Sequence, residues 1–276
     1  MADGFRVRAM GRDDHRCVLA LVDADRLPGQ PVAGSDLLTA PSRDGLVRPV
    51  TLVLTDAADA VRGVVHCAVR TRDGAGLIGW LHAYEDFTTA AALVAVARAH
   101  LRPVLALYAG FGPTQAPASG VLHLPGIPRC LRPATTRALR AAGFTPAAGR
   151  LYFHHPLALP LLAPSSRFPR AEVRAQSDPA GVRLTLFAAD GQVLAVAVLH
   201  TFDDGPWHLW HLGVRSDRRY RDVASHLLAQ CLQTARCCGA TGVIAHTDED
   251  DERRAGVLQR AGFTTVDTLA VYHRRP

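Results

Sequence analysis

A strand-like segment runs through a cluster of arginines into a helical pattern between residues 208 and 228, which read HLWHLGVRSDRRYRDVASHLL. The first backbone N–H groups of a helix have no intrahelical acceptor, and neighbouring guanidinium groups add positive charge. This combination predicts an anion site at the turn. Its predicted ligands, through side chains or backbone amides, are Val214, Arg215, Arg219, Arg221, Val223 and Ala224.

Histidines on the strand before this turn offer proton transfer. His211 stands three residues before Val214, and the ordinary pKa of histidine suits a general base near neutral pH. His211 is therefore a candidate catalytic base, the alternative being a partly buried strand histidine, and His208, His246 and Asp248 are candidate substrate contacts. Residues three apart on a regular strand face opposite sides, so His208 and His211 are not expected to hold a metal together.

The sequence predicts no metal site and no redox centre. The acidic run 248–252 precedes a predicted helix and lacks the glycine of a calcium loop, so we interpret it as the start of that helix. The cysteines form no C-x-x-C pair, which favours buried core residues over redox chemistry. They are Cys17, Cys67, Cys130, Cys231, Cys237 and Cys238.

The elements that must position these residues occur twice. ALRAAGFT at 138–145 matches VLQRAGFT at 257–264, and a tyrosine follows each at nearly the same distance. A duplicated domain explains this repeat. We predict a domain over 1–155, a Pro-rich linker over 156–171 and a second domain over 172–276, which would be the donor-binding and catalytic one.

The second half predicts a mixed α/β fold. Its expected strands are 183–189, 192–202, 207–214, 242–247 and 265–273, and its expected helices run from about Val223 to Gly239 and over 250–261. The first half gives the same order, with helices over 15–24, 88–101 and 133–142 among strands at 5–10, 51–57, 61–69, 76–84 and 104–110.

This order resembles the GNAT superfamily of N-acetyltransferases, best over residues 172–273. In that family a strand ending in Val leads to R/Q-x-x-G-x-G/A, whose amides hold the pyrophosphate of acetyl-CoA. Here the motif is Arg219-Tyr220-Arg221-Asp222-Val223-Ala224, with Asp222 in place of the middle glycine. A carboxylate there can cap the same amides and repel a phosphate.

The resemblance implies an N-acyltransferase of two tandem GNAT-like domains, which moves an acyl group from acyl-CoA to an amine of a small molecule. The family's usual tyrosine, four residues before the G of G-F, is Leu258 in the second copy and Leu139 in the first. The first copy carries Glu85 and Asp86 at the equivalent turn and is not expected to bind CoA. Its role would then be to help shape the acceptor site.

Two alternatives stay open. Tandem GNAT-like folds also occur in aminoacyl-tRNA-dependent transferases, and no acidic residue lies between Asp86 and Glu172. On this alternative tRNA would be the partner, and the arginines that contact its phosphates would be Arg129, Arg132, Arg137 and Arg140. The second alternative is a binding module without catalysis, because the glycine and both tyrosines are missing.

Composition limits the class of protein. A chain of 276 residues with 48% apolar residues can form two ordinary globular domains. Its longest apolar runs, 157–163 and 92–97, are far too short to span a membrane, and the first ten residues lack a signal-peptide core. We therefore expect a cytoplasmic protein without a membrane partner, and the sequence leaves its oligomeric state open.

Overall fold

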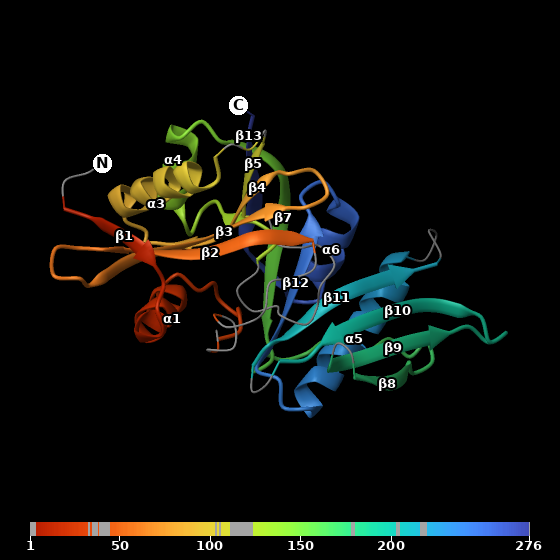
Figure 1. The fold of residues 1–276 in the computed structure, drawn as a ribbon. Helices are drawn as coiled ribbons and strands as arrows, with labels where there is room; N and C mark the ends of the chain where they lie inside the picture. Colours follow the sequence, from red (N-terminus) through yellow and green to blue (C-terminus); the bar gives the residue numbers. More distant parts are fainter. Residues whose placement is uncertain are drawn as a thin grey trace. The chain divides into compact units, whose positions relative to one another are not determined.

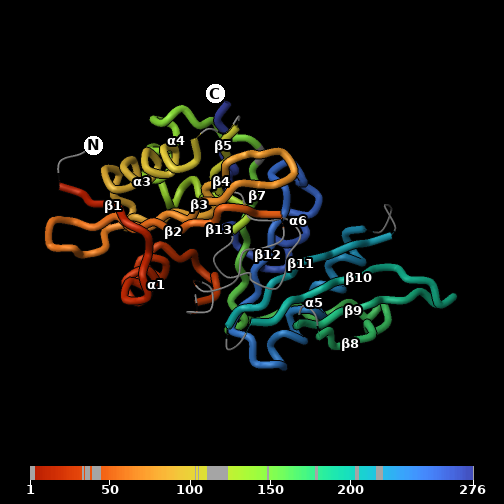
Figure 2. The backbone as a smooth tube through the Cα atoms, in the orientation of Figure 1, coloured from red at the N-terminus to blue at the C-terminus, as the bar shows by residue number. Residues whose placement is uncertain are grey.

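The computed structural model describes residues 4–32, 34, 38, 45–102, 104, 106–110, 124–177, 180–202, 205–215 and 220–275. The chain folds into two compact units (Figures 1 and 2). Unit 1 comprises Met1–Leu27, Val32–Arg150 and Thr268–Pro276, and unit 2 comprises Pro28–Pro31 and Leu151–Asp267. These units are defined by contacts between residues, and each contains segments from both halves of the chain. The domain boundaries predicted from the repeat therefore stay a prediction.

Unit 1 contains a mixed sheet. Its strands pair in the order β1-β2-β3-β4-β5-β13-β7, and β4 and β5 are parallel. The strands are β1 (Arg6–Ala9), β2 (Leu46–Thr55), β3 (Val61–Arg70), β4 (Gly76–His82), β5 (Leu107–Ala109) and β6 (Ile127–Pro128), which pairs with β13. The last strands of the two halves, β7 (Thr145–Pro156) and β13 (Thr264–Arg274), each pass through both units.

Helices cover both faces of the unit 1 sheet. Side chains alternate along a strand, so Leu54 joins a core beneath α3 and α4, whereas Val53 packs with Leu21 of α1 on the opposite face. The helices of unit 1 are α1 (His15–Ala24), α3 (Phe87–His100) and α4 (Pro133–Ala141), with the short 3₁₀ helix η1 (Arg12–Asp14) before α1.

Unit 2 pairs its strands in the order β13-β7-β12-β11-β10-β9-β8, and β11 and β12 are parallel. Its further elements are β8 (Glu172–Ser177), β9 (Ala180–Phe187), β10 (Val193–His200), β11 (Trp207–Val214), α5 (Tyr220–Cys237), β12 (Gly242–Asp248) and α6 (Glu252–Arg260). Apart from the two-residue strand β6, the order strand, helix, strand, helix, strand from β4 to β7 recurs from β11 to β13, in accordance with the predicted repeat. The predicted α/β class with a mixed sheet is confirmed.

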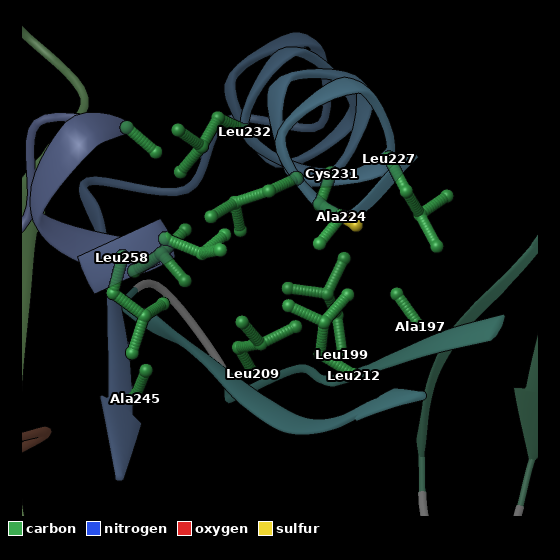
Figure 3. Close-up of a cluster of buried hydrophobic side chains, with 14 of the residues drawn as sticks. Ala197, Leu199, Leu209, Leu212, Ala224, Leu227, Cys231, Leu232, Ala245 and Leu258 are labelled. Atoms are coloured by element: carbon green, nitrogen blue, oxygen red, sulfur yellow. The ribbon is translucent and has the colours of Figure 1, made fainter. Parts of the chain in front are cut away.

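One helix-covered core holds unit 2 together. Leu227 and Cys231 of α5 point toward Leu209 and Leu212 of β11, and Leu258 of α6 joins the same cluster (Figure 3). Unit 1 places α1 between its first two strands, β1 and β2, but only residues 178 and 179 separate β8 from β9. The described helices of unit 2 therefore pack on one face of its sheet, and its other face has no counterpart of α1.

Two sequence expectations are wrong in detail. The helix expected from about Val223 begins at Tyr220. Cys67 and Cys231 are buried as predicted, and burial raises the pKa of the Cys67 thiol to about 12. The other four cysteines are exposed because they lie outside the core-facing positions of their segments: Cys17, Cys130, Cys237 and Cys238.

A buried ionic network ties three elements of unit 1 together. The Asp25 carboxylate, which follows α1, lies 3.1 Å from His82 Nδ1 on β4 and 3.2 Å from Arg132 Nη2 before α4. Arg132 Nε also donates to Glu85 at 3.1 Å. Burial alone would raise the pKa of Asp25, but the hydrogen bond from His82 and the charge of Arg132 outweigh it, so the pKa is lowered.

We predict that Asp25→Ala lowers the free energy of unfolding by about 3 kcal/mol, because it removes one carboxylate from a buried guanidinium. The matched control is Asp23→Ala, which breaks the exposed pair with Arg26 at 2.9 Å and should cost less than about 1 kcal/mol. Urea unfolding measures both, and equal losses for the two variants would contradict a structural role for the network.

Candidate functional site

A β-bulge in β11 is the main irregularity of unit 2. Val198 of β10 pairs with His211, but the next residue, Leu199, pairs with Leu209, so Trp210 is an extra residue. The parallel pairs between β11 and β12 end at Leu209 and Ala245. A bulge bends the strand that carries it and strengthens its twist. Among the described residues, β11 therefore separates from β12 just before His211.

The bulge places His208 and His211 on the same face of the sheet. His208 pairs with His200 and His211 pairs with Val198, two positions apart on β10. The expectation that they face opposite sides is therefore wrong, because it assumed a regular strand. Leu209 and Leu212, also three residues apart, both point into the opposite, helix-covered core (Figure 3).

The His211 side chain is exposed to solvent in part, and its imidazole ring lies beside Gly213 of the same strand, β11. A Cβ atom added to Gly213 would lie 2.6 Å from His211 Nε2, so only glycine at 213 leaves room for this ring position. Burial, then the charges of Arg254 and Arg183, lower the pKa of His211. The imidazole is therefore neutral at pH 7, the state in which it can accept a proton.

Five further rings form a row beside it. His200 stacks on Trp210 with 5.3 Å between centroids, and His208 meets both rings edge-on. His208 Nε2 lies 3.0 Å from Nδ1 of His246, whose ring contacts Tyr152. Burial lowers the pKa of His208 to about 3, which keeps it neutral. The structure thus brings together two of the predicted substrate contacts.

Asp248, the third predicted contact, is exposed at the end of β12.

Sequence reasoning missed other residues near His211, namely His200, Trp210, Tyr152, Arg183 and Arg254. His200 lies at the end of an apolar strand that pairs with the strand of His211, and this position could have indicated it. The positions of the other four residues depend on strand register or on contacts with distant parts of the chain.

The predicted anion site lies at the start of α5. The described part of α5 starts at Tyr220, and the amides at the start of a helix lack an intrahelical acceptor; residues 216–219, which precede it, lie outside the described residues. The amides of Val223 and Ala224 then belong to the helix, and both side chains are buried in the core. Their role as ligands stays a prediction.

Charged residues at this turn take different positions. Arg221 and Asp222 are exposed, and Asp222 is the third residue of the helix rather than its N-cap. Arg215, after Val214, donates to the side-chain oxygen of Gln192 at 2.6 Å. Arg219 lies outside the described residues, so its predicted role stays a prediction.

The first turn of α6 contacts the start of α5. The Arg253 guanidinium lies 3.9 Å from the centroid of the Tyr220 ring. Asp251 caps α6 by accepting a hydrogen bond from the Arg254 backbone N at 2.9 Å. The interpretation of the acidic run as a helix start is confirmed.

The equivalent turn of unit 1 is filled by its own carboxylates. Asp86 caps α3 through the Thr89 amide at 2.7 Å, and Glu85 accepts a hydrogen bond from the Ala134 amide of α4 at 2.8 Å. Tyr84 and Glu85 adopt positive φ values of 49° and 53° to reach these positions. A carboxylate of this turn therefore already pairs with the Thr89 amide at the start of α3, and the other pairs with α4.

The arginines predicted to contact RNA differ in position. Arg132 is buried and paired with Asp25 and Glu85, so its guanidinium does not face solvent, and its assignment as an RNA contact is corrected. Arg137 and Arg140 are exposed on α4, with Arg137 lying 4.2 Å from the centroid of the Phe87 ring. Arg129 is half-buried.

The leucines in place of the family's tyrosine cannot donate a proton. Leu258 and Leu139 are both fully buried in the cores of their units.

Within the part of the chain that the structure describes, no helix is long and apolar enough to cross a membrane.

Comparisons with known proteins agree with this architecture. Residues 153–263 match the model of the acetyltransferase (GNAT) family, and among curated proteins none matches the chain at a significant level. A GCN5-related N-acetyltransferase from Sphaerobacter thermophilus has a TM-score of 0.66 at 15% identity, covering 100% of this chain and 98% of that one. A tandem GNAT protein from the clavulanic acid biosynthesis pathway gives 0.66 at 12% identity, covering 98% of each chain.

A third similar structure is the glucosamine N-acetyltransferase region of a fungal multi-domain β-N-acetylglucosaminidase. Its TM-score is 0.64 at 15% identity, with 99% of this chain and 38% of that chain covered. At these identities the similarity establishes the fold alone, which is the tandem GNAT fold predicted from the sequence.

We predict that the protein loses stability as the pH falls from about 6.5 toward 4. Burial lowers the pKa of His66 to about 4 and that of His208 to about 3, below the value of about 6.5 for an unfolded histidine. In this window the unfolded chain binds more protons than the folded protein, so the free energy of unfolding decreases as the pH falls.

Urea unfolding across this window measures the effect. The lowered carboxylate pKa values, such as that of Asp86, act mainly below about pH 4 and do not interfere. Replacing His66 with Gln should flatten the dependence, and a free energy of unfolding that stays constant down to pH 4 would contradict the prediction.

Proposed function

Residues 153–263 belong to the acetyltransferase (GNAT) family, and we propose that this protein is an acyltransferase which forms an amide between an acyl group from acyl-CoA and an amine of a small molecule. The observation that carries the proposal is the separation of β11 from β12 at the bulge, with His211 beside it and the start of α5 shortly after Val214. These features unite a proton acceptor with a set of free amides.

The start of α5 supports donor binding. The amides of Tyr220, Arg221 and Asp222 are suited to a diphosphate, with Arg221 adding positive charge. When bound, acyl-CoA supplies a thioester whose acyl group passes to the amine nitrogen, with the CoA thiol as leaving group. The Asp222 carboxylate opposes an anion there, so the residues fit acyl-CoA with a reduced affinity.

His211 is suited to be the general base. Its neutral imidazole would accept the proton that the amine loses as the new N–C bond forms. The ring's place over Gly213 restricts its orientation, which favours a fixed position for this proton transfer. Leu258 offers no proton to the departing thiol, so in this proposal the thiolate takes its proton from solvent.

The alternative donor, aminoacyl-tRNA, has less support. Arg132 is buried in an ionic network, which leaves Arg137 and Arg140 as the exposed arginines of α4 in the acid-free segment. The binding-module alternative is disfavoured by the uncovered, ring-rich face around His211. Both alternatives are outcomes of the experiments below.

Asp222→Gly should bind acetyl-CoA about tenfold more tightly than the unmodified protein, because an exposed, partly screened charge is removed from the phosphate site. Calorimetry measures this change. The control is Glu252→Gln, which neutralises an acidic residue in the first turn of α6 and should leave the affinity unchanged.

Absence of acetyl-CoA binding by every form would remove acyl-CoA as donor. Total tRNA tested by gel shift over a salt series then decides between the alternatives. Binding that weakens in an Arg137→Gln/Arg140→Gln double variant and falls steeply with salt would point to aminoacyl-tRNA. Binding of neither ligand would leave a module without catalysis.

His211→Gln should lower the rate of amide formation by about 100-fold or more, since it removes the proton acceptor but keeps a side chain of similar reach. Release of free CoA thiol from acetyl-CoA, measured with a panel of primary amines, follows the reaction. Because its pKa is lowered, the acidic limb of the rate profile should have its midpoint below about pH 6.5. An unchanged rate in His211→Gln would exclude it as the base.

A further inference from the structure

A row of four residues crosses the face of the unit 2 sheet opposite α5 and α6. Arg174 of β8 pairs with Arg183 of β9, Arg183 with Val198 of β10, and Val198 with His211 of β11. Directly paired residues point to the same face of a sheet. Leu184, next to Arg183, is buried on the opposite, helix-covered face. The two arginines are therefore in register with His211 on the face that α5 and α6 leave open.

The charges in this row are not balanced. Arg174 and Arg183 lie directly opposite each other on adjacent strands, an arrangement of like charges that is unfavourable. Arg174 donates to Glu172 of its own strand at 2.7 Å, but no acidic residue in the described part of the chain forms an ion pair with Arg183. The other described acid placed on this face by strand alternation is Asp248, at the end of β12.

A flat apolar surface lies next to this row. Trp210, the extra residue of the bulge, is 40% exposed. His200, which is buried, stacks against it at an interplanar angle of 28° and holds the indole in place. An exposed and supported indole offers a stacking surface for a planar or apolar part of a ligand.

Resting on the function proposed above, we infer that Arg183 and Trp210 form the acceptor subsite and that the acceptor is an anionic amine, a small molecule which carries a carboxylate or phosphate as well as the reacting amine. The anionic group pairs with Arg183, the apolar part lies on Trp210, and the amine points to His211.

The dimensions and the charge agree with this class of acceptor. Arg183 and His211 are separated by one strand, which places their Cα atoms about 10 Å apart. An arginine side chain covers more than half of that distance, so a small molecule reaches both residues. A polycation such as a polyamine would meet Arg183 and Arg254, the two charges that act on His211, and would be repelled.

Direct binding without an acyl donor tests the subsite. The probe is N-acetylphenylalanine, which has a carboxylate and a ring but no amine, and its neutral counterpart is N-acetylphenylalanine amide. Calorimetry should show the acid binding at least tenfold more tightly than the amide. Phenyl phosphate, the second anionic probe, distinguishes a phosphate site from a carboxylate site by which of the two acids binds more tightly.

Arg183→Gln should remove the difference between acid and amide. Arg236→Gln, which neutralises an exposed arginine in the last turn of α5, should preserve it. Equal binding of acid and amide, tighter binding of spermidine, or an unchanged preference in Arg183→Gln would overturn the inference.

The two proposals fail separately. If the anionic probes bind as expected but no amine is acylated from acetyl-CoA, the acyl-CoA function fails and the anion subsite stands. If thiol release occurs with neutral or cationic amines and is unaffected by Arg183→Gln, the function stands and the anionic acceptor is wrong.

Discussion

Side chains alternate between the two faces of a strand, and one inserted residue reverses this alternation for everything that follows it. In β11 the inserted residue is Trp210. It allows Leu209 and Leu212 both to enter the helix-covered core, and His208 and His211 both to face the other side. Without the insertion, a strand that buried Leu209 would direct His211 into apolar surroundings. The core and the candidate site therefore depend on the same irregularity.

The same bulge occurs in unit 1, where it has a different result. His66 pairs with Trp80 and Cys67 pairs with Ile78, so Gly79 is the extra residue of β4. Trp80 then stands where unit 2 has His211, and it is buried against α1. Only two residues connect β8 with β9, so unit 2 has no helix at the place of α1. The corresponding position is therefore buried under α1 as Trp80 in unit 1, whereas it is the exposed His211 in unit 2.

The two copies differ in the charged residues at the start of the corresponding helices, α3 and α5. In unit 1, Asp86 accepts a hydrogen bond from the Thr89 amide of α3, and Glu85 accepts one from the Ala134 amide of α4. These two amides are therefore not available to an anionic ligand. In unit 2 the described part of the same turn carries Arg221, and Asp222 lies inside the helix. Two turns of one fold therefore differ through a few side chains, without any change in the order of their elements.

The element order and the family resemblance could be predicted because local periodicity and the repeated G-F endings do not depend on tertiary contacts. Features that depend on pairing could not. The bulge at Trp210 is a matter of register with β10, and the burial of Arg132 depends on Asp25, 107 positions away in the chain. The start of α5 was missed by three residues, because Tyr220 and Arg221 are acceptable in a helix but give no boundary signal.

The cations around His211 affect both binding and proton transfer in the proposed reaction. Burial, then the charge of Arg254 and last that of Arg183, lower the pKa of His211, and an anion paired with Arg183 would cancel the smallest of these three contributions. The pKa of His211 would then rise toward its ordinary value when an anionic acceptor binds, which makes the imidazole a stronger base near neutral pH. An amine without the anionic group would leave Arg183 uncompensated and His211 a weaker base. Selection for an anionic acceptor would therefore act on the rate of amide formation as well as on affinity.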